Sequence, residues 1–253
     1  MNIFSVFWIY RQYRNPRCLH RIDRQLHNVL SSINDTISPK EMTVTGLLIA
    51  VTFIAAYLLG SIPTAYIIGK IRKGTDIREV GSKNMGAMNV IYNVGFWWGA
   101  LVMTVDIGKG VLVMAVAKAL LMPGHDLAWY AAGIIVILGH NFPIFLKFRG
   151  GKGGATAVGV LSYLMFPFGF LVGLGTFGLL LAIIRFPTLS YGIGLLTFPF
   201  VGWLHYHNGN WVIFSSIVVA IPFIRYVPRL KEIYKKAGNL GHAIRRKNLK
   251  DRF

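Results

Sequence analysis

Long apolar segments separated by short loops constrain this chain more than any other feature. Only 14% of its 253 residues are charged, whereas soluble domains hold roughly a quarter. A membrane-spanning helix needs about 20 mostly apolar residues, and most of these segments approach or exceed that length. We therefore predict an all-α polytopic membrane helix bundle. The apolar segments are 43–69, 96–121, 128–146, 157–184, 187–204 and 211–226.

The basic residues are sorted between the loops in a way that indicates orientation. Lysine and arginine gather in loops 70–83 and 147–152 and in the tail from Arg229, whereas loops 122–127 and 205–210 contain neither. Cytoplasmic loops of membrane proteins carry the excess of Lys and Arg. We therefore expect the first group of loops to face the cytoplasm and the second group to face the opposite side.

This sorting requires segment 157–184 to cross the membrane twice. Loop 147–152 is expected inside, and Arg185 must also be inside because one segment, 187–204, leads from it to an outer loop. Residues 166–169, Phe-Pro-Phe-Gly, are the expected break, because proline and glycine interrupt helices. The count becomes about seven transmembrane passes, some of them short or re-entrant.

Two basic segments flank the predicted membrane domain, which we place at residues 42–226. Residues 1–41 contain five arginines, no long apolar run and no signal-peptide pattern. They are either a basic surface helix or the product of a misassigned start, since Met42 opens the first apolar segment. Residues 227–253 form a predicted basic cytoplasmic tail. Because the net charge of +18 follows the flanks and loops of a membrane protein, we expect no nucleic-acid partner.

Two polar, glycine-rich motifs lie in loops that are predicted to share a side. They are DIREVGSKNMGAMNV at Asp76–Val90 and GHNFPIFLKFRGGKGGAT at Gly139–Thr156. Glycine lets backbone N–H groups converge on an anion, and Lys147, Arg149 and Lys152 add positive charge for phosphate. Neither motif has the spacing of a Walker A loop or of a dinucleotide-binding fingerprint. We predict that the two motifs meet in one cytoplasm-facing pocket.

Glycine has a second use in membrane proteins, because its lack of a side chain lets helices pack closely. We favour packing for the scattered Gly173, Gly175 and Gly178. We favour anion binding for the run from Gly150 to Gly154, because cations surround it. Helix packing stays open as the alternative for that run.

Three of the ionisable residues within or at the end of apolar segments are candidates for a site. Asp106 and Lys109 are three residues apart and therefore on one face of the predicted helix. Ionisable groups at such positions are costly, so the pair either faces a site or forms a structural salt bridge, and the sequence leaves both open. His140 adjoins the cationic glycine loop and is either a site residue or a satisfied interfacial histidine.

Together these motifs resemble a known family. GSIPTAYIIGK (60–70), the first motif, DIGKG (106–110) and the second motif are similar to the bacterial membrane-integral glycerol-3-phosphate acyltransferases that use acyl phosphate. The similarity runs from Leu59 to Thr156 and weakly to Leu230. It implies transfer of a fatty acyl group from acyl phosphate to glycerol 3-phosphate, giving lysophosphatidic acid for phospholipid synthesis, without cofactor or metal. It also implies a cytoplasm-facing site in the bacterial inner membrane, with the acyl chain in contact with the lipid bilayer.

The resemblance and the residue chemistry together define a candidate site. We expect catalytic roles for Ser82, Asn84 and His140. An acyl phosphate is already activated, so the site needs positioning and charge stabilisation rather than a covalent acyl-enzyme. Phosphate contacts are expected from Lys83, Asn89, Lys147, Arg149, Gly150, Gly151, Lys152 and Gly153, and intramembrane polar support from Asp106 and Lys109.

Several positions depart from the family pattern. This chain has Lys83 where the family has glycine and Tyr92 where it has arginine, and we hypothesise that Lys83 restores the missing charge. Phe223 and Tyr226 stand at the positions of a histidine and an asparagine in the family's third motif. Two alternatives therefore stay open: a catalytically weak relative that binds lipid intermediates, and a transporter of a phosphorylated solute. The absence of an internal repeat in the sequence disfavours the transporter.

Overall fold

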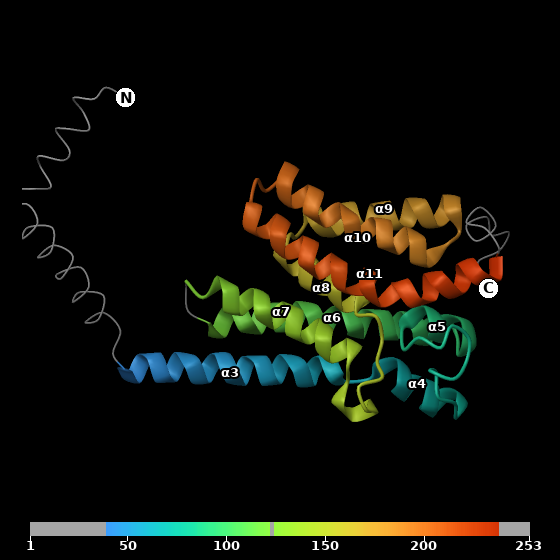
Figure 1. Cartoon of the computed structure of the whole chain (residues 1–253), viewed down its shortest axis with the longest axis horizontal. Helices are drawn as coiled ribbons and strands as arrows, with labels where there is room; N and C mark the ends of the chain where they lie inside the picture. The colour runs from blue at the N-terminus through green and yellow to red at the C-terminus, as the bar shows by residue number, and fades with distance from the viewer. Residues whose placement is uncertain (1–38, 122–123, 238–253) are drawn as a thin grey trace, which may run out of the picture. The chain divides into compact units, whose positions relative to one another are not determined.

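The computed structural model describes residues 39–121 and 124–237, and every regular element within them is a helix (Figure 1). The chain divides into two compact units, Met1–Leu48 and Ile49–Phe253. The elements are α3 (Pro39–Ser61), α4 (Thr64–Lys73), α5 (Ala87–Asn93), α6 (Phe96–Leu120), α7 (Asp126–Asn141), the 3₁₀ turn η1 (Ile144–Leu146), α8 (Gly154–Leu164), α9 (Phe168–Ile184), α10 (Pro187–Leu204) and α11 (Gly209–Ala237).

The predicted flanking segments fall largely outside the described residues. Of the extension 1–41, the structure describes only residues 39–41, which begin α3. Helix α11 continues without interruption through Tyr226 to Ala237, so the expected boundary between membrane domain and tail lies inside one helix. Residues 238–253 of the tail lie outside the described part of the chain.

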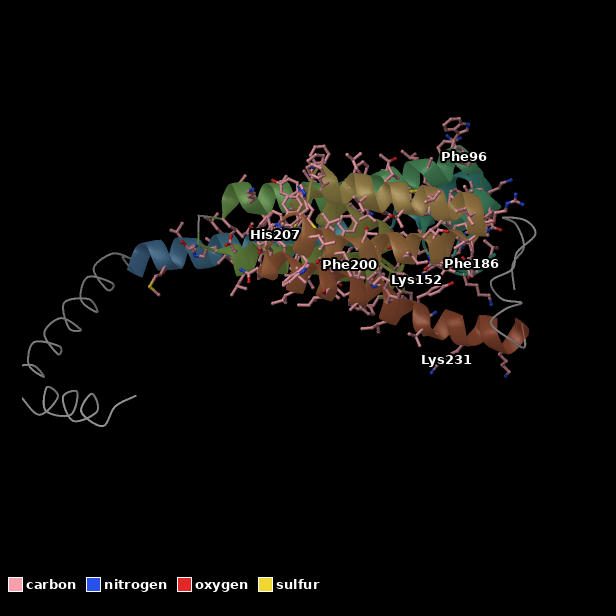
Figure 2. The ribbon with its side chains drawn as sticks, turned by 90° about the horizontal axis from the view of Figure 1, so that it is seen from above. Phe96, Lys152, Phe186, Phe200, His207 and Lys231 are labelled. Carbon is pink, nitrogen blue, oxygen red and sulfur yellow. The ribbon has the colours of Figure 1, made fainter. Side chains whose placement is uncertain are left out.

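Apolar helices of two lengths make up the described chain, as a polytopic membrane bundle requires. Four segments are long and apolar enough to cross a membrane, and three further apolar helices are shorter. Large apolar side chains such as Leu179, Ile183 and Phe200 (Figure 2) are about two-thirds exposed, at 64%, 68% and 65%, which suits contact with lipid. The four long segments are Met42–Lys73, Phe96–Leu120, Asp126–Leu146 and Gly209–Pro228, and the shorter helices are Gly154–Leu164, Phe168–Ile184 and Leu189–Leu204.

The apolar segment 157–184 contains two short helices, as predicted. Helix α8 ends at Leu164, and α9 begins at Phe168 after a turn that holds the cis peptide bond of Pro167. Proline at this point has no N–H to continue the ladder of α8.

The apolar segment 43–69, counted as one pass, lies within one candidate span, Met42–Lys73, but its helix is interrupted. Helix α3 ends at Ser61 and α4 begins at Thr64, because Pro63 cannot donate a backbone hydrogen bond and disfavours the helical conformation of Ile62. At the break the Ile62 carbonyl accepts hydrogen bonds from the Thr64 N–H at 3.0 Å and from the Lys109 Nζ at 2.7 Å. A cation inside the bundle thus helps to satisfy the interrupted backbone.

Close contacts between backbones hold α6 against α8. A Cβ added at Gly110 would lie 2.7 Å from the Val160 nitrogen, and one at Gly159 would overlap the Ile107 carbonyl. The packing role expected for scattered glycines also holds at Gly173, whose Cβ would meet Phe198 at 3.0 Å. It is wrong for Gly175 and Gly178, which face open space.

The helix connections gather at two ends of the second unit. Figure 1 shows the end of α6, the start of α7 and the connection from α10 to α11 at one end, with α4 and α5 at the other. Figure 2 likewise shows His207 far along the helices from Phe186. The described parts of the loops without Lys or Arg therefore lie at the opposite end of the helices from the basic segment that contains the first motif.

Candidate active site

One cavity of about 300 Å³ joins the two polar motifs. Ser82 and Asn84 reach it from the first motif and Lys152 from the second, so the prediction that the motifs meet in one pocket is confirmed. Helices α6 and α7 contribute Asp106 and His140. Of the candidate residues, Ser82, Asn84, Asn89, Asp106, His140, Lys152 and Gly153 line the cavity, whereas Lys83, Lys109, Lys147, Arg149, Gly150 and Gly151 do not.

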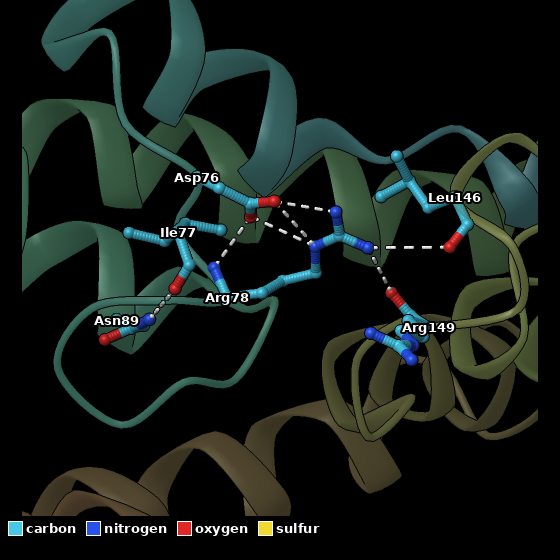
Figure 3. A network of polar contacts seen from close by, with 6 residues as sticks. All are labelled: Asp76, Ile77, Arg78, Asn89, Leu146 and Arg149. Carbon is cyan, nitrogen blue, oxygen red and sulfur yellow. Dashed lines mark hydrogen bonds and ion pairs between the residues drawn. The ribbon is translucent and has the colours of Figure 1, made fainter.

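Asn89 shapes the first motif from inside. Its Nδ2 donates to the carbonyls of Ile77, Val80 and Asn84 at 2.7, 3.1 and 3.0 Å (Figure 3 shows the first of these), and its Oδ1 accepts the Ser82 N–H at 3.0 Å. The residue is only 2% exposed. Because this loop lacks the regular backbone hydrogen bonds of a helix or a sheet, the side-chain amide of Asn89 provides partners for its backbone groups. Its hydrogen-bonding groups are thus engaged in holding the loop around Ser82 and Asn84.

Arg78, which the sequence did not single out, forms a salt bridge within the first motif and hydrogen bonds to the second (Figure 3). The Arg78 Nε and Nη2 donate to the Asp76 carboxylate at 3.0 and 2.7 Å, and Nη1 donates to the carbonyls of Leu146 and Arg149 at 3.5 and 3.4 Å. The hydrogen bonds from Arg78 hold the pKa of Asp76 below its ordinary value of 3.8. The Asp-x-Arg spacing inside the first motif could have indicated this salt bridge, because a planar guanidinium can donate to both oxygens of a carboxylate.

The glycines of the second motif pack against the end of α7 and the first motif. The Gly151 N–H donates to the His140 carbonyl at 3.1 Å, and a Cβ on Gly151 would overlap the His140 imidazole and lie 2.6 Å from the Met85 carbonyl. A Cβ on Gly150 would overlap the His140 carbonyl and the Pro143 ring. Gly153 has φ +79°, which favours glycine. Close packing, the open alternative for this run, is therefore real at Gly150 and Gly151.

The cationic side chains of this motif differ in position. Lys147 and Arg149 are exposed, and the backbone of Lys147 is left-handed with φ +53°. Lys152 is partly buried, and its Nζ lies 4.0 Å from the centre of the Tyr226 ring. Of these three cations, only Lys152 lines the cavity.

The sequence left open whether Asp106 and Lys109 face a site or form a structural salt bridge, and the structure gives one answer for each residue. The Lys109 Nζ donates to Asp106 Oδ1 at 2.6 Å, to the Ile62 carbonyl at 2.7 Å and to Thr64 Oγ1 at 2.8 Å, which uses all three of its hydrogens. Lys109 is therefore structural. Asp106 anchors the same cluster and also lines the cavity.

His140 is buried, with 4% exposure, and borders the cavity beside Asp106. Its Nδ1 lies 3.8 Å from Asp106 Oδ1, beyond hydrogen-bond distance, and has no hydrogen-bond partner in the described part of the chain. The imidazole is thus held by packing against Gly151, with a free nitrogen on the side of the Asp106 carboxylate.

Helix α11 closes the second motif from a distant part of the sequence. The Arg225 Nη2 donates to the Gly151 carbonyl at 3.3 Å, and the guanidinium lies 4.8 Å from the centre of the Phe142 ring. Neither Arg225 nor Tyr226 was a candidate from the sequence. The signal for Arg225 was a cation within the last turn of the apolar segment 211–226, since ionisable residues in such segments usually serve a site or a partner.

The other half of the cavity is apolar. Phe170, Leu174 and Phe177 of α9 line it together with Leu195 and Phe198 of α10. The cavity is therefore lined by charged and hydrogen-bonding groups in one part and by apolar side chains in the other. Such a site suits an amphipathic ligand with an anionic head and a long alkyl tail. Within residues 39–121 and 124–237, no group of three or more His, Cys, Asp or Glu side chains is placed to hold a metal ion.

Known proteins share both the sequence and this fold. The family model described as "Glycerol-3-phosphate acyltransferase" matches residues 50–236. The chain is 56% identical over 210 residues to "Glycerol-3-phosphate acyltransferase 2" of Dehalococcoides mccartyi, covering 82% of this chain and 98% of that protein. It is 37% identical over 193 residues to "Glycerol-3-phosphate acyltransferase" of Bacillus subtilis, covering 75% and 96%.

Two crystal structures of PlsY (YgiH), an integral membrane glycerol 3-phosphate acyltransferase, are similar to this fold. The glycerol 3-phosphate form has a TM-score of 0.65 and 31% identity, over 74% of this chain and 92% of that one. The lysophosphatidic acid form has a TM-score of 0.63 and 30% identity over the same shares.

Proposed function

Because this chain belongs to the glycerol-3-phosphate acyltransferase family, we propose that it transfers a fatty acyl group from acyl phosphate to glycerol 3-phosphate. The product is lysophosphatidic acid, made for phospholipid synthesis. The observation that carries the proposal is the single cavity that joins two phosphate-type motifs to an apolar wall. An acyl phosphate has that division of character, with an anionic head and an alkyl tail.

The reaction is a direct displacement. The sn-1 hydroxyl oxygen of glycerol 3-phosphate bonds to the carbonyl carbon, the bond from that carbon to the phosphate oxygen breaks, and phosphate leaves with the hydroxyl proton. Because phosphate is already a good leaving group, the protein supplies position and charge rather than a covalent intermediate.

Each candidate residue takes a role that fits its place. Lys152 and the first N–H groups of α8 hold phosphate, since a helix N-terminus and a cation both favour an anion. Ser82 and Asn84 orient donor or acceptor from the first motif, with Asn89 fixing their loop. The buried His140 completes the polar wall beside Asp106.

The remaining cations act from outside the cavity. Lys83, Lys147 and Arg149 are exposed and attract the two anionic substrates towards the site. Lys83 has φ +55° and does not line the cavity, while Tyr92 does. If Lys83 replaces the charge of the missing arginine, it therefore acts on the substrates by long-range attraction and not by contact inside the cavity.

We place the enzyme in the bacterial inner membrane with this site facing the cytoplasm. The support is the excess of Lys and Arg in the loops around both motifs. Acyl phosphate would then enter from the bilayer with its tail between helices, and glycerol 3-phosphate would enter from the cytoplasm.

The proposal is tested with the purified full chain in phospholipid vesicles. Palmitoyl phosphate and radiolabelled glycerol 3-phosphate should give labelled lysophosphatidic acid and one phosphate per product, while palmitoyl-CoA should not serve as donor. If palmitoyl-CoA gave product and palmitoyl phosphate did not, the proposed donor would be wrong and acyl-CoA would take its place.

Lys152→Ala is the sharpest single change, with Lys118→Ala as its control. Lys152 lines the cavity, whereas Lys118 of α6 is exposed, does not line the cavity and lies over the ring of Trp129 in α7. Loss of a charge-assisted phosphate contact costs roughly 1.5–3 kcal/mol, so the KM for glycerol 3-phosphate should rise about tenfold to a hundredfold. Equal KM values in the two variants would make the glycine-lysine loop purely structural.

One alternative has an observation of its own. Tyr92 and Tyr226 line the cavity at positions where the family has an arginine and an asparagine. A catalytically weak relative that binds lipid intermediates would bind lysophosphatidic acid in the vesicle assay but form no product from any acyl donor.

A further inference from the structure

A buried hydroxyl in the cavity wall has no role in the chemistry described so far. Tyr191 lies in the first turns of α10 and lines the cavity. Its hydroxyl oxygen is shielded from solvent and has no hydrogen-bond partner among the described residues. An unmade hydrogen bond at a buried donor is costly, so such a group in a ligand cavity indicates a partner supplied by the ligand.

The surroundings of this hydroxyl define where that partner would be. A Cβ added at Gly154 would overlap the Tyr191 hydroxyl oxygen, so the phenol reaches the first residue of α8. The first N–H groups of a helix have no carbonyl within it to receive them. Gly154 and Ala155 line the cavity, as does Lys152 two residues before Gly154. The hydroxyl is therefore a further donor beside a region that already favours negative charge.

The same face of α10 continues into the apolar half of the cavity. Tyr191, Leu195 and Phe198 are spaced i, i+4 and i+7, which puts them on one face of the helix, and all three line the cavity. An acyl phosphate with its tail along Leu195 and Phe198 and its phosphate at Lys152 has its carbonyl group between them. That is the level of the Tyr191 hydroxyl.

We propose that the Tyr191 hydroxyl donates a hydrogen bond to the carbonyl oxygen of the acyl donor and stabilises its negative charge in the transition state. The proposal rests on acyl phosphate as the donor. When the acceptor hydroxyl oxygen bonds to the carbonyl carbon, the carbonyl π electrons move onto the oxygen. When the carbonyl re-forms, the carbon–oxygen bond to phosphate breaks and phosphate leaves with the acceptor's proton. Tyr191 keeps its own proton throughout.

The first test is Tyr191→Phe, which removes only the oxygen atom, with Tyr163→Phe as control. Tyr163 is a partly buried tyrosine of α8 that packs near Trp129 and does not line the cavity. Loss of one preorganised donor to a developing oxyanion lowers kcat about a hundredfold to a thousandfold. The KM for glycerol 3-phosphate should stay within about twofold of wild type, and Tyr163→Phe should behave as wild type.

The second test varies the strength of the donor at constant shape. Replacement of Tyr191 by 3-fluorotyrosine makes the phenol more acidic and hence a stronger hydrogen-bond donor, so kcat with palmitoyl phosphate should stay near wild type or exceed it. If Tyr191 were only structural, Tyr191→Phe would lower kcat and the thermal stability in detergent together. That pattern, or Tyr191→Phe with wild-type kcat, would overturn the proposal.

The proposed donor and this inference fail in different ways. If the wild-type chain does not use palmitoyl phosphate, the proposed function fails before any variant is compared. If the wild-type chain uses it and Tyr191→Phe raises only the KM for palmitoyl phosphate, the hydroxyl binds the ground state and the transition-state role is excluded.

Discussion

A single methyl group separates the two uses of glycine in this protein. At Gly151 an added Cβ would overlap the His140 ring, whereas at Gly175 it would meet nothing within 4 Å. Both residues are glycine in a membrane protein, and their neighbours in space, not in sequence, decide what each is for.

Gly151→Ala should therefore displace His140 and the second motif together. We expect activity to fall at least tenfold, because small misplacements of site groups are costly. Gly175→Ala, the control, should keep full activity and gain about 0.5–1 kcal/mol, the usual advantage of alanine over glycine within a helix. Radiolabelled product formation and thermal unfolding in detergent measure the two effects. Wild-type activity in Gly151→Ala would show that the loop tolerates a wider separation.

Sequence patterns located the helices better than the connections between them. The break at Pro167 followed from charge parity, but the break at Pro63 was missed because apolar residues continue on both sides of it. Asn89 was expected to bind phosphate, since sequence shows its polarity but not the carbonyls around it. Arg225 was missed because its contact at Gly151 is 74 residues away along the chain.

At the scale of elements, Lys109 joins the broken α3–α4 segment to α6. Lys109→Met should destabilise the fold by about 3–5 kcal/mol, because the Asp106 carboxylate would remain buried without its partner. The double variant Asp106→Asn with Lys109→Met should recover part of this loss, since no buried charge is left. Thermal unfolding in detergent measures both. A double variant no more stable than the single one would mean that the Ile62 carbonyl, not the charge, needs Lys109.

The link between the two motifs should respond to acid. The native pKa of Asp76 is depressed by Arg78, so the ionised carboxylate is favoured in the folded state. The stability it contributes is present above the unfolded value of 3.8 and is lost as the pH falls through the lower native pKa. The melting temperature of wild type should exceed that of Asp76→Asn near neutral pH. This difference should shrink as the pH falls below 3.8; a constant difference would contradict the salt-bridge account.

At the scale of the whole molecule, the two ends of the helices should face different compartments. In a Cys18→Ser background, Asn210→Cys should react with a membrane-impermeant maleimide in intact cells. Glu79→Cys, in the basic loop of the first motif, should react only after the cells are permeabilised, because that loop is proposed to be cytoplasmic. Labelling of both positions in intact cells would reverse the assignment for the first motif.

The contacts that α11 makes with the second motif set an order of events during synthesis. Arg225 and Tyr226 contact Gly151 and Lys152 from the last described helix, so these contacts cannot form until α11 has been synthesised. A nascent chain with all earlier helices inserted still lacks this wall of the cavity. A chain cut before α11 would lack the Arg225 contact with Gly151 and the Tyr226 contact with Lys152, so the second motif would lose its support from this helix.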